Sequence, residues 1–258
     1  MEIQQFLWSC SRSNLRKKMN KKNFFTLLMP FRSLVFFLIF TIGSAITKKE
    51  LSEISNWWSI AASIVNILMV LFLFAVAKKN GSSFGQLINY QKGNTNVKEV
   101  ILITLLIIVV GMAGMYLAGF VCYGVIPYSP PAMVAPVPAV LAIANYFILP
   151  VSTAFAEEGV YLGCGVNQIK NKYAAIFIPA FFFALQHSFI PTLFDGKYIL
   201  YRFLSFLPLT IVLCWNFYKK RNPLPIMIGH AILDVATTSM ILATSLIPGL
   251  YETMLSLR

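Results

Sequence analysis

The run ILITLLIIVVGMAGMYLAGFV occupies residues 101–121 and contains no charged side chain. A helix of about 20 apolar residues crosses the hydrocarbon core of a bilayer, so this segment predicts a transmembrane helix. Similar runs recur along the chain, which has 258 residues, of which 58% are hydrophobic and 12% charged. A soluble helical protein would not contain several apolar runs of this length. The chain is therefore predicted to be an all-α, polytopic membrane protein.

The apolar runs predict about seven or eight transmembrane helices. One range, 135–169, is too long for a single span, and Pro136, Pro138 and Pro150 lie within it. Because proline interrupts helices, this range is expected to hold a short or re-entrant piece followed by a long helix. The expected helices are 24–46, 57–77, 99–121, 135–169, 172–190, 199–218 and 223–247.

Positive charge is concentrated on alternate connections between these helices. The arm 1–23 is basic, as are the connections that contain Lys78, Lys170 and Lys219, whereas the connection 122–134 carries no charge. Basic connections stay in the cytoplasm, so the N-terminus is expected to be cytoplasmic. The arm is expected to lie on anionic lipid headgroups. This asymmetry accounts for the net charge of +12, and no nucleic-acid partner is expected.

A few titratable residues interrupt the apolar segments of the C-terminal half. They are Glu157, Glu158, Asp234 and the two histidines of the chain, His187 and His230. Such groups cost several kcal/mol in hydrocarbon unless they are paired or face a polar cavity. From the rise of a helix, Glu157, His187, His230 and Asp234 lie roughly 10–22 Å from the cytoplasmic helix ends, at similar depths. The sequence therefore predicts a buried polar site in the C-terminal helix bundle, made of residue types that catalyse hydrolysis.

Local spacing refines this hypothesis. His230 and Asp234 are four residues apart on one helix face, so the carboxylate is placed to orient the imidazole. Phe183 is expected to pack beside His187 for the same reason. Glu157 and Glu158 project about 100° apart, so one is expected to face the reaction centre and the other a supporting partner. Taken singly, each residue also has a structural interpretation, such as an interhelical hydrogen bond.

These residues resemble the motifs of the CPBP intramembrane proteases, also called the CAAX prenyl protease 2/Abi family. That family carries EExxxR, FxxxH and HxxxN or HxxxD, in this order, on successive core helices. The matching segments are Glu157–Gly163, Phe183–His187 and His230–Asp234, and the resemblance covers about residues 135–245. The expected organisation is a basic arm at 1–23, N-terminal transmembrane helices at 24–134, a catalytic core at 135–247 and a tail at 248–258.

The resemblance implies an intramembrane endopeptidase that hydrolyses a peptide bond of a membrane-associated peptide or protein. Glu157 would be the general base for a water molecule, and His187 would bind and polarise that water. His230 and Asp234 would stabilise the tetrahedral intermediate, and Glu158 would orient a histidine. If Zn²⁺ is used, Glu157, His187 and His230 would be its ligands. The spacing lacks the compact HExxH pattern, which slightly favours a reaction without an obligatory metal.

One departure from the family pattern keeps other functions open. Leu162 stands where the motif has an arginine, the expected partner of a glutamate, and no nearby Arg or Lys is an obvious substitute. Either another group compensates, a glutamate is protonated, or activity is reduced or lost. The main alternative is a non-cleaving regulator or immunity protein. A proton-coupled transporter is less favoured because no internal repeat is visible. Family analogy suggests a bacterial plasma membrane and a part in peptide maturation or bacteriocin self-immunity.

Overall fold

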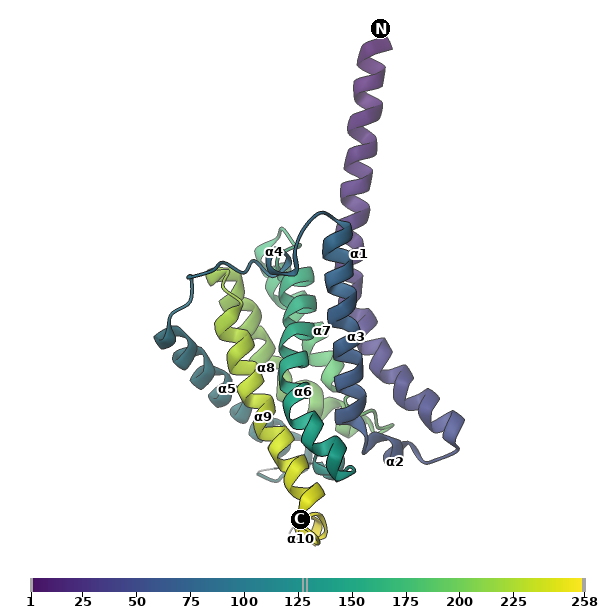
Figure 1. Cartoon of the computed structure of the whole chain (residues 1–258), viewed down its shortest axis with the longest axis vertical. Helices are drawn as coiled ribbons and strands as arrows, with labels where there is room; N and C mark the ends of the chain where they lie inside the picture. Colours follow the sequence, from purple (N-terminus) through teal and green to yellow (C-terminus); the bar gives the residue numbers. More distant parts are fainter. Residues whose placement is uncertain (1, 127, 129, 257–258) are drawn as a thin grey trace.

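The computed structural model describes residues 2–126, 128 and 130–256, with side chains from Phe25 onward. Over these residues the chain forms helices and their connections, without a β-strand. The helices pack side by side in a bundle, and the N-terminal part of α1 (Glu2–Thr47) projects beyond its end (Figure 1). The predicted all-α class is therefore confirmed.

The longer helices agree with the apolar runs of the sequence. Six helical segments of the described chain are long and apolar enough to cross a membrane: Phe25–Thr47, Trp58–Lys79, Val97–Tyr123, Ala139–Val166, Gly196–Lys220 and Leu224–Leu246. Helix α7, the fifth expected span, has 16 residues and is about 24 Å long. The elements after α1 are α2 (Leu51–Ser55), α3 (Trp58–Lys79), α4 (Phe84–Leu87), α5 (Val97–Tyr123), the 3-10 helix η1 (Pro131–Val134), α6 (Ala139–Glu157), the π-helix η2 (Glu158–Val166), α7 (Lys172–His187), α8 (Gly196–Lys220), α9 (Leu224–Leu246) and α10 (Leu250–Ser256).

The long apolar range 135–169 contains one continuous span of 28 residues, Ala139–Val166. Pro136 and Pro138 precede the helix in an extended connection, where the missing N–H group of proline is tolerated. Pro150 lies inside α6 without ending it. The structure thus has the predicted long helix, and an extended linker stands in place of a re-entrant piece.

Helix α6 lies at the centre of the packing that forms the site. It packs against α3 on one side and α9 on another, while α7 packs against α8 and α1. Helix α1 also contacts η2, and Gly165 allows a close approach there. A Cβ atom at Gly165 would lie 2.9 Å from both Met29 Sδ of α1 and Pro179 Cγ of α7. The small residue therefore brings α1 against the two helices that carry much of the site.

The basic connections gather at one end of the bundle. The N-terminal end of α1 and the α3–α5 and α8–α9 connections lie at the same end (Figure 1). Asn89 Nδ2 donates to Arg221 O at 2.8 Å, and Arg221 Nη1 donates to Asn167 Oδ1 at 2.8 Å, which joins three of these connections. This arrangement agrees with the predicted grouping of basic connections. The expected contact of the arm 1–23 with lipid headgroups concerns side chains outside the described part of the chain.

Candidate active site

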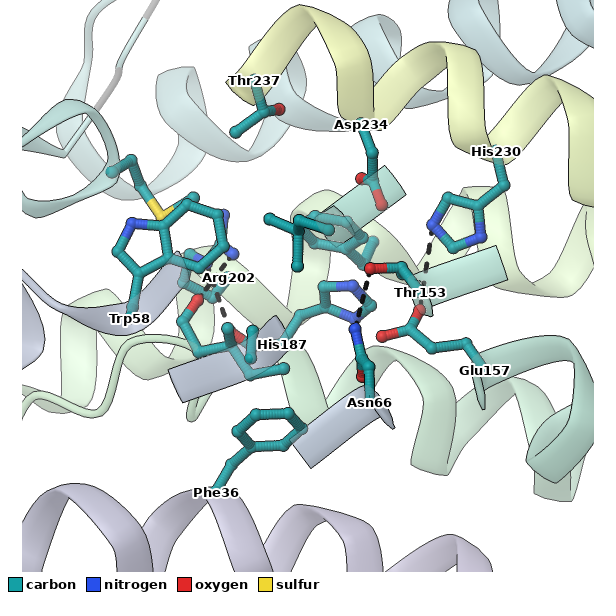
Figure 2. Close-up of a pocket in the computed structure, with 15 residues that line it drawn as sticks. Phe36, Trp58, Asn66, Thr153, Glu157, His187, Arg202, His230, Asp234 and Thr237 are labelled. Atoms are coloured by element: carbon teal, nitrogen blue, oxygen red, sulfur yellow. Dashed lines mark hydrogen bonds and ion pairs between the residues drawn. The ribbon is translucent and has the colours of Figure 1, made fainter. Parts of the chain in front are cut away.

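A buried polar cavity of about 70 Å³ lies where α1, α3, α6, α7, α8 and α9 converge (Figure 2). A space of this size accommodates more than one ordered water molecule. Four residues that the sequence placed at similar depths on three helices line it together. They are Glu157, His187, His230 and Asp234.

The two adjacent glutamates face different neighbours. Glu157 is the last residue of α6 and lines the cavity. Glu158 begins the π-helix η2, is fully buried, and has its Oε1 atom 2.8 Å from His230 Nδ1. The geometry therefore matches the expected division, with one carboxylate facing the cavity and the other facing a histidine. Short π-helical segments are frequent at functional sites.

His230 of α9 lies between the two carboxylates. While Nδ1 is paired with Glu158, its Nε2 atom lies 3.8 Å from Glu157 Oε2 (Figure 2). A carboxylate partner accepts a hydrogen bond from Nδ1–H, which leaves Nε2 directed toward Glu157. Glu158, rather than Asp234, is thus the hydrogen-bond partner of the imidazole. Asp234, one turn further along α9, lies beside Thr153.

His187, the last residue of α7, has its ring fixed from several directions. Its Nδ1 atom lies 2.8 Å from Phe183 O, and because a carbonyl oxygen only accepts, Nδ1 carries the proton. The ring stacks on Phe206 of α8 with 3.7 Å between centroids, and on Phe183 with 5.8 Å. The predicted packing of Phe183 beside His187 is confirmed. Nε2, the unprotonated ring nitrogen, can then accept a hydrogen bond from a water molecule in the cavity.

Comparison with known proteins identifies a family for the part of the chain that carries these residues. A family model described as type II CAAX prenyl endopeptidase Rce1-like matches residues 139–236. This range contains all five predicted site residues and confirms the resemblance carried by their motifs. Over residues 139–236 the chain is therefore similar to the CPBP intramembrane protease family, as its motifs indicated. Neither a curated protein nor a solved structure matches the chain.

An arginine outside the matched range 139–236 supplies a positive charge beside Glu157. Arg32 of α1 is fully buried, and its Nη2 atom lies 3.2 Å from Glu157 Oε1. Its Nε atom donates to Gln186 Oε1 at 2.6 Å, and Nη2 also donates to Asn66 Oδ1. The sequence analysis did not single out Arg32. The available signal was its position as the only charged residue in the expected helix 24–46.

Neutral side chains extend the contacts of Arg32 to further helices. Gln186 of α7 also accepts a hydrogen bond from Tyr161 of η2, with 2.9 Å between Oε1 and the phenolic oxygen. Asn66 of α3 donates from Nδ2 to Thr153 Oγ1 of α6 at 2.9 Å. Both amide oxygens receive hydrogen bonds from the guanidinium, which fixes their orientation. The network therefore links α1, α3, α6, η2 and α7 around one carboxylate.

A second buried arginine, Arg202 of α8, supports the end of α7. Its Nε atom donates to His187 O at 3.2 Å, and Nη2 donates to Ile190 O at 2.9 Å. Its guanidinium carbon lies 4.9 Å from the centroid of the Phe206 ring, which also stacks on His187. Arg202 thus adds a second hydrogen bond to His187 O, which also accepts one from Ile190 N at 3.3 Å, and it donates to Ile190 O beyond the helix end. Arg202 thereby fixes the backbone of a predicted catalytic histidine, and the sequence analysis missed it too.

A larger apolar chamber of about 490 Å³ adjoins the polar cavity. Helices α5, α8 and α9 form most of its walls, with aliphatic and methionine side chains that adapt to the shape of a guest. The two spaces share four lining residues, and an apolar group held in the chamber would therefore lie next to the polar cavity. The shared residues are Met133, Arg202, Phe206 and Thr237.

The candidate zinc ligands Glu157, His187 and His230 line one cavity without forming a recognisable metal site. Among the described side chains, no group of three His, Cys, Asp or Glu residues is arranged to hold a metal ion. The arrangement therefore does not fit a three-ligand zinc centre. No step of the reaction proposed below passes through a metal.

Proposed function

We propose that this protein is an intramembrane endopeptidase in which Glu157 activates a water molecule. The observation that carries the proposal is the grouping of Glu157, His187 and His230 around a buried cavity large enough for water. The match of this region to a protease family supports the same reaction class. Carboxylate and imidazole groups in contact with water are suited to general acid–base hydrolysis.

In the first step, Oε2 of Glu157 takes a proton from the water as the water oxygen bonds to the carbonyl carbon of the substrate. Oε2 is buried without a hydrogen-bond partner in the described structure, so it is available to accept this proton. His187 orients the same water by accepting its second hydrogen at Nε2. The electron pair of the carbonyl double bond moves to the oxygen, which becomes an oxyanion.

In the second step, His230 and Asp234 stabilise the oxyanion. His230 in its protonated form donates from Nε2, and its charge, with that of Arg32, balances the two carboxylates of Glu157 and Glu158. Asp234 donates a second hydrogen bond when it is protonated, as the asparagine of the HxxxN form of the motif does. When the intermediate collapses, the C–N bond breaks and Glu157 returns its proton to the leaving amine.

The substrate is proposed to be a membrane-associated peptide or protein with a large apolar group next to the scissile bond. The apolar chamber beside the polar cavity supports this substrate class. The proposed location is a bacterial plasma membrane, where such a substrate would be found. The basic connections would then lie in the cytoplasm, as the charge asymmetry indicates. Peptide maturation or bacteriocin self-immunity is the proposed context.

The proposal is tested by comparing membranes that contain equal amounts of the wild type, Glu157→Gln or His187→Ala. Released peptides and new protein N-termini are identified by mass spectrometry. A matched control is Glu53→Gln, because this glutamate lies on α2 with 58% of its side chain exposed, far from the site in sequence. Products found with the wild type and the control, and absent from both site variants, support proteolysis and identify the substrate.

The alternative of a non-cleaving regulator or immunity protein is motivated by Leu162. The ion pair between Arg32 and Glu157 weighs against it, because a positive charge is still supplied to the carboxylate. If no product distinguishes the wild type from the variants, and both variants keep the cellular phenotype, the protease proposal is wrong. That outcome would support the non-cleaving alternative.

A further inference from the structure

The arginine of the EExxxR motif is absent from η2, yet Glu157 has a buried guanidinium beside it. We propose that Arg32 of α1 replaces the motif arginine as the positioning residue for Glu157. This inference rests on the proposed function, because it gives Arg32 a part in the activation of water. It assigns a role in catalysis to a helix outside the matched range 139–236.

The two oxygens of Glu157 are used differently, which is the first argument for this role. Oε1 lies 3.2 Å from Arg32 Nη2, whereas Oε2 is buried without a hydrogen-bond partner among the described residues. His230 Nε2 is 3.8 Å from Oε2, on the cavity side. Arg32 therefore holds one oxygen and leaves the other directed toward the space for water. A carboxylate fixed in this way is oriented for proton transfer before the substrate binds.

The second argument is that Arg32 is itself held in place. Gln186 and Asn66 accept hydrogen bonds from its Nε and Nη2 atoms, and its guanidinium carbon lies 5.2 Å from the centroid of the Phe36 ring. An arginine side chain fully buried within a membrane span costs too much free energy to persist without such partners. These contacts give the guanidinium one defined position at Glu157.

The third argument concerns residue 162, where the family motif has an arginine and this chain has a leucine. Residue 162 follows Glu157 by five residues and Glu158 by four, which is about one turn of a π-helix. Leu162 is fully buried in the apolar core. An arginine at 162 would therefore lie on the same side of η2 as the glutamates. Arginines at both 32 and 162 would place two guanidinium groups near one cluster of carboxylates, so the two positions are expected to be alternatives.

The experiment compares the wild type with Arg32→Gln, Leu162→Arg and the double variant on the substrate identified above. Arg32→Gln should lower kcat about 100-fold with little change in KM, because a misplaced base slows chemistry more than binding. Leu162→Arg alone should also reduce activity, through an excess buried charge. The double variant should recover much of the kcat lost in Arg32→Gln. Ser33→Ala, the adjacent buried residue of α1, is the control and should retain wild-type kcat.

A second measurement does not depend on activity. Thermal unfolding in detergent is recorded for Arg32→Gln, Glu157→Gln and the double variant of these two. The double variant should unfold at a higher temperature than additive effects predict, because Arg32→Gln alone leaves a buried carboxylate unpaired. Additive shifts, or an Arg32→Gln protein with wild-type kcat, would overturn the assignment. Absence of cleavage by the wild type would overturn the proposed function. The thermal unfolding of the three variants would still show whether Arg32 and Glu157 interact.

Discussion

Glu158 and His230 are 72 residues apart in the sequence, yet Oε1 of the glutamate lies 2.8 Å from Nδ1 of the histidine. The pair joins the start of η2 to α9, and both side chains are buried. It fixes the orientation of the imidazole ring. Because Nδ1 is paired with Glu158, Nε2 points toward Glu157 and the cavity. The catalytic role proposed for His230 therefore depends on Glu158, which does not line the cavity itself.

Replacing Glu158 by glutamine and by leucine separates hydrogen bonding from charge. Glutamine still accepts a hydrogen bond from Nδ1–H, whereas leucine does not. We expect kcat to fall about 10-fold in Glu158→Gln and about 100-fold in Glu158→Leu, in line with other residues that orient a histidine. Steady-state kinetics on variants with matched unfolding temperatures checks this order. Equal activities for the two variants would show that the hydrogen bond has no part in the reaction.

Asp234 offers a test of the proposed oxyanion contact. Asparagine donates a hydrogen bond at every pH, whereas aspartic acid donates only when protonated. Asp234→Asn should therefore keep activity and lose any decline of kcat with rising pH that comes from Asp234. Asp234→Ala should lose about 100-fold in kcat, the usual cost of removing an oxyanion donor. Inactivity of the asparagine variant in a pH–rate profile would contradict this role.

Arg202 is expected to stabilise the fold at the end of α7. Arg202→Met removes hydrogen bonds to the carbonyl groups of His187 and Ile190 while keeping much of the side-chain volume. His187 O keeps its hydrogen bond from Ile190 N, whereas Ile190 O loses the bond from Arg202, and an unpaired buried acceptor costs about 1–3 kcal/mol. Thermal unfolding in detergent should show a lower midpoint than for the wild type. An unchanged midpoint would contradict this stabilising role of Arg202.

The apolar chamber predicts selectivity for the size of the substrate. Ala236 of α9 lines the chamber but not the polar cavity, so Ala236→Phe should narrow the chamber without touching the catalytic groups. KM should rise roughly 10-fold for substrates with a large apolar group and change little for those with a small one. Ala45→Phe on α1, at an exposed position, is the matched control. A uniform effect on both substrates would argue against the chamber as a binding site.

A chelator tests whether the reaction needs a metal. Because the proposed steps use Glu157 and the two histidines directly, incubation of the purified protein with 1,10-phenanthroline should leave kcat unchanged. The rate of cleavage is measured before the chelator is added and again after the incubation, once the chelator has been removed. Loss of activity that added Zn²⁺ restores would contradict the metal-free reaction and return the histidines to a role as ligands.

The helices were predictable because an apolar run leaves a backbone in lipid few choices besides a helix. The range 101–121 lies within α5, and 57–77 corresponds closely to α3. The π-helical geometry of η2 was not predictable in this way, because its sequence is as apolar as that of an ordinary helix. The elements that contact η2 are α1, α4, α6, α7 and α8.

The candidate site was predictable to the extent that titratable residues stand out in apolar segments. Glu157, His187 and His230 were found by this contrast, and their convergence by the rise of a helix. The partners were harder to predict. Spacing along one helix pointed to Asp234 beside His230, whereas His230 Nδ1 pairs with Glu158 on another segment, as the family resemblance and not the spacing implied. Arg32 was missed for the same reason, since its contact with the site depends on packing between helices.

The position of Arg32 in the first span also constrains how the protein enters the membrane. Its acidic partner is made 125 residues later, so at about 5–20 residues per second the guanidinium waits roughly 6–25 s for the carboxylate. Asn66 follows by only 34 residues and is the first of the side chains that hydrogen-bond to this guanidinium to be synthesised. The cation is therefore synthesised well before its carboxylate, and Asn66 of α3 is the side chain available to hydrogen-bond it in the interval.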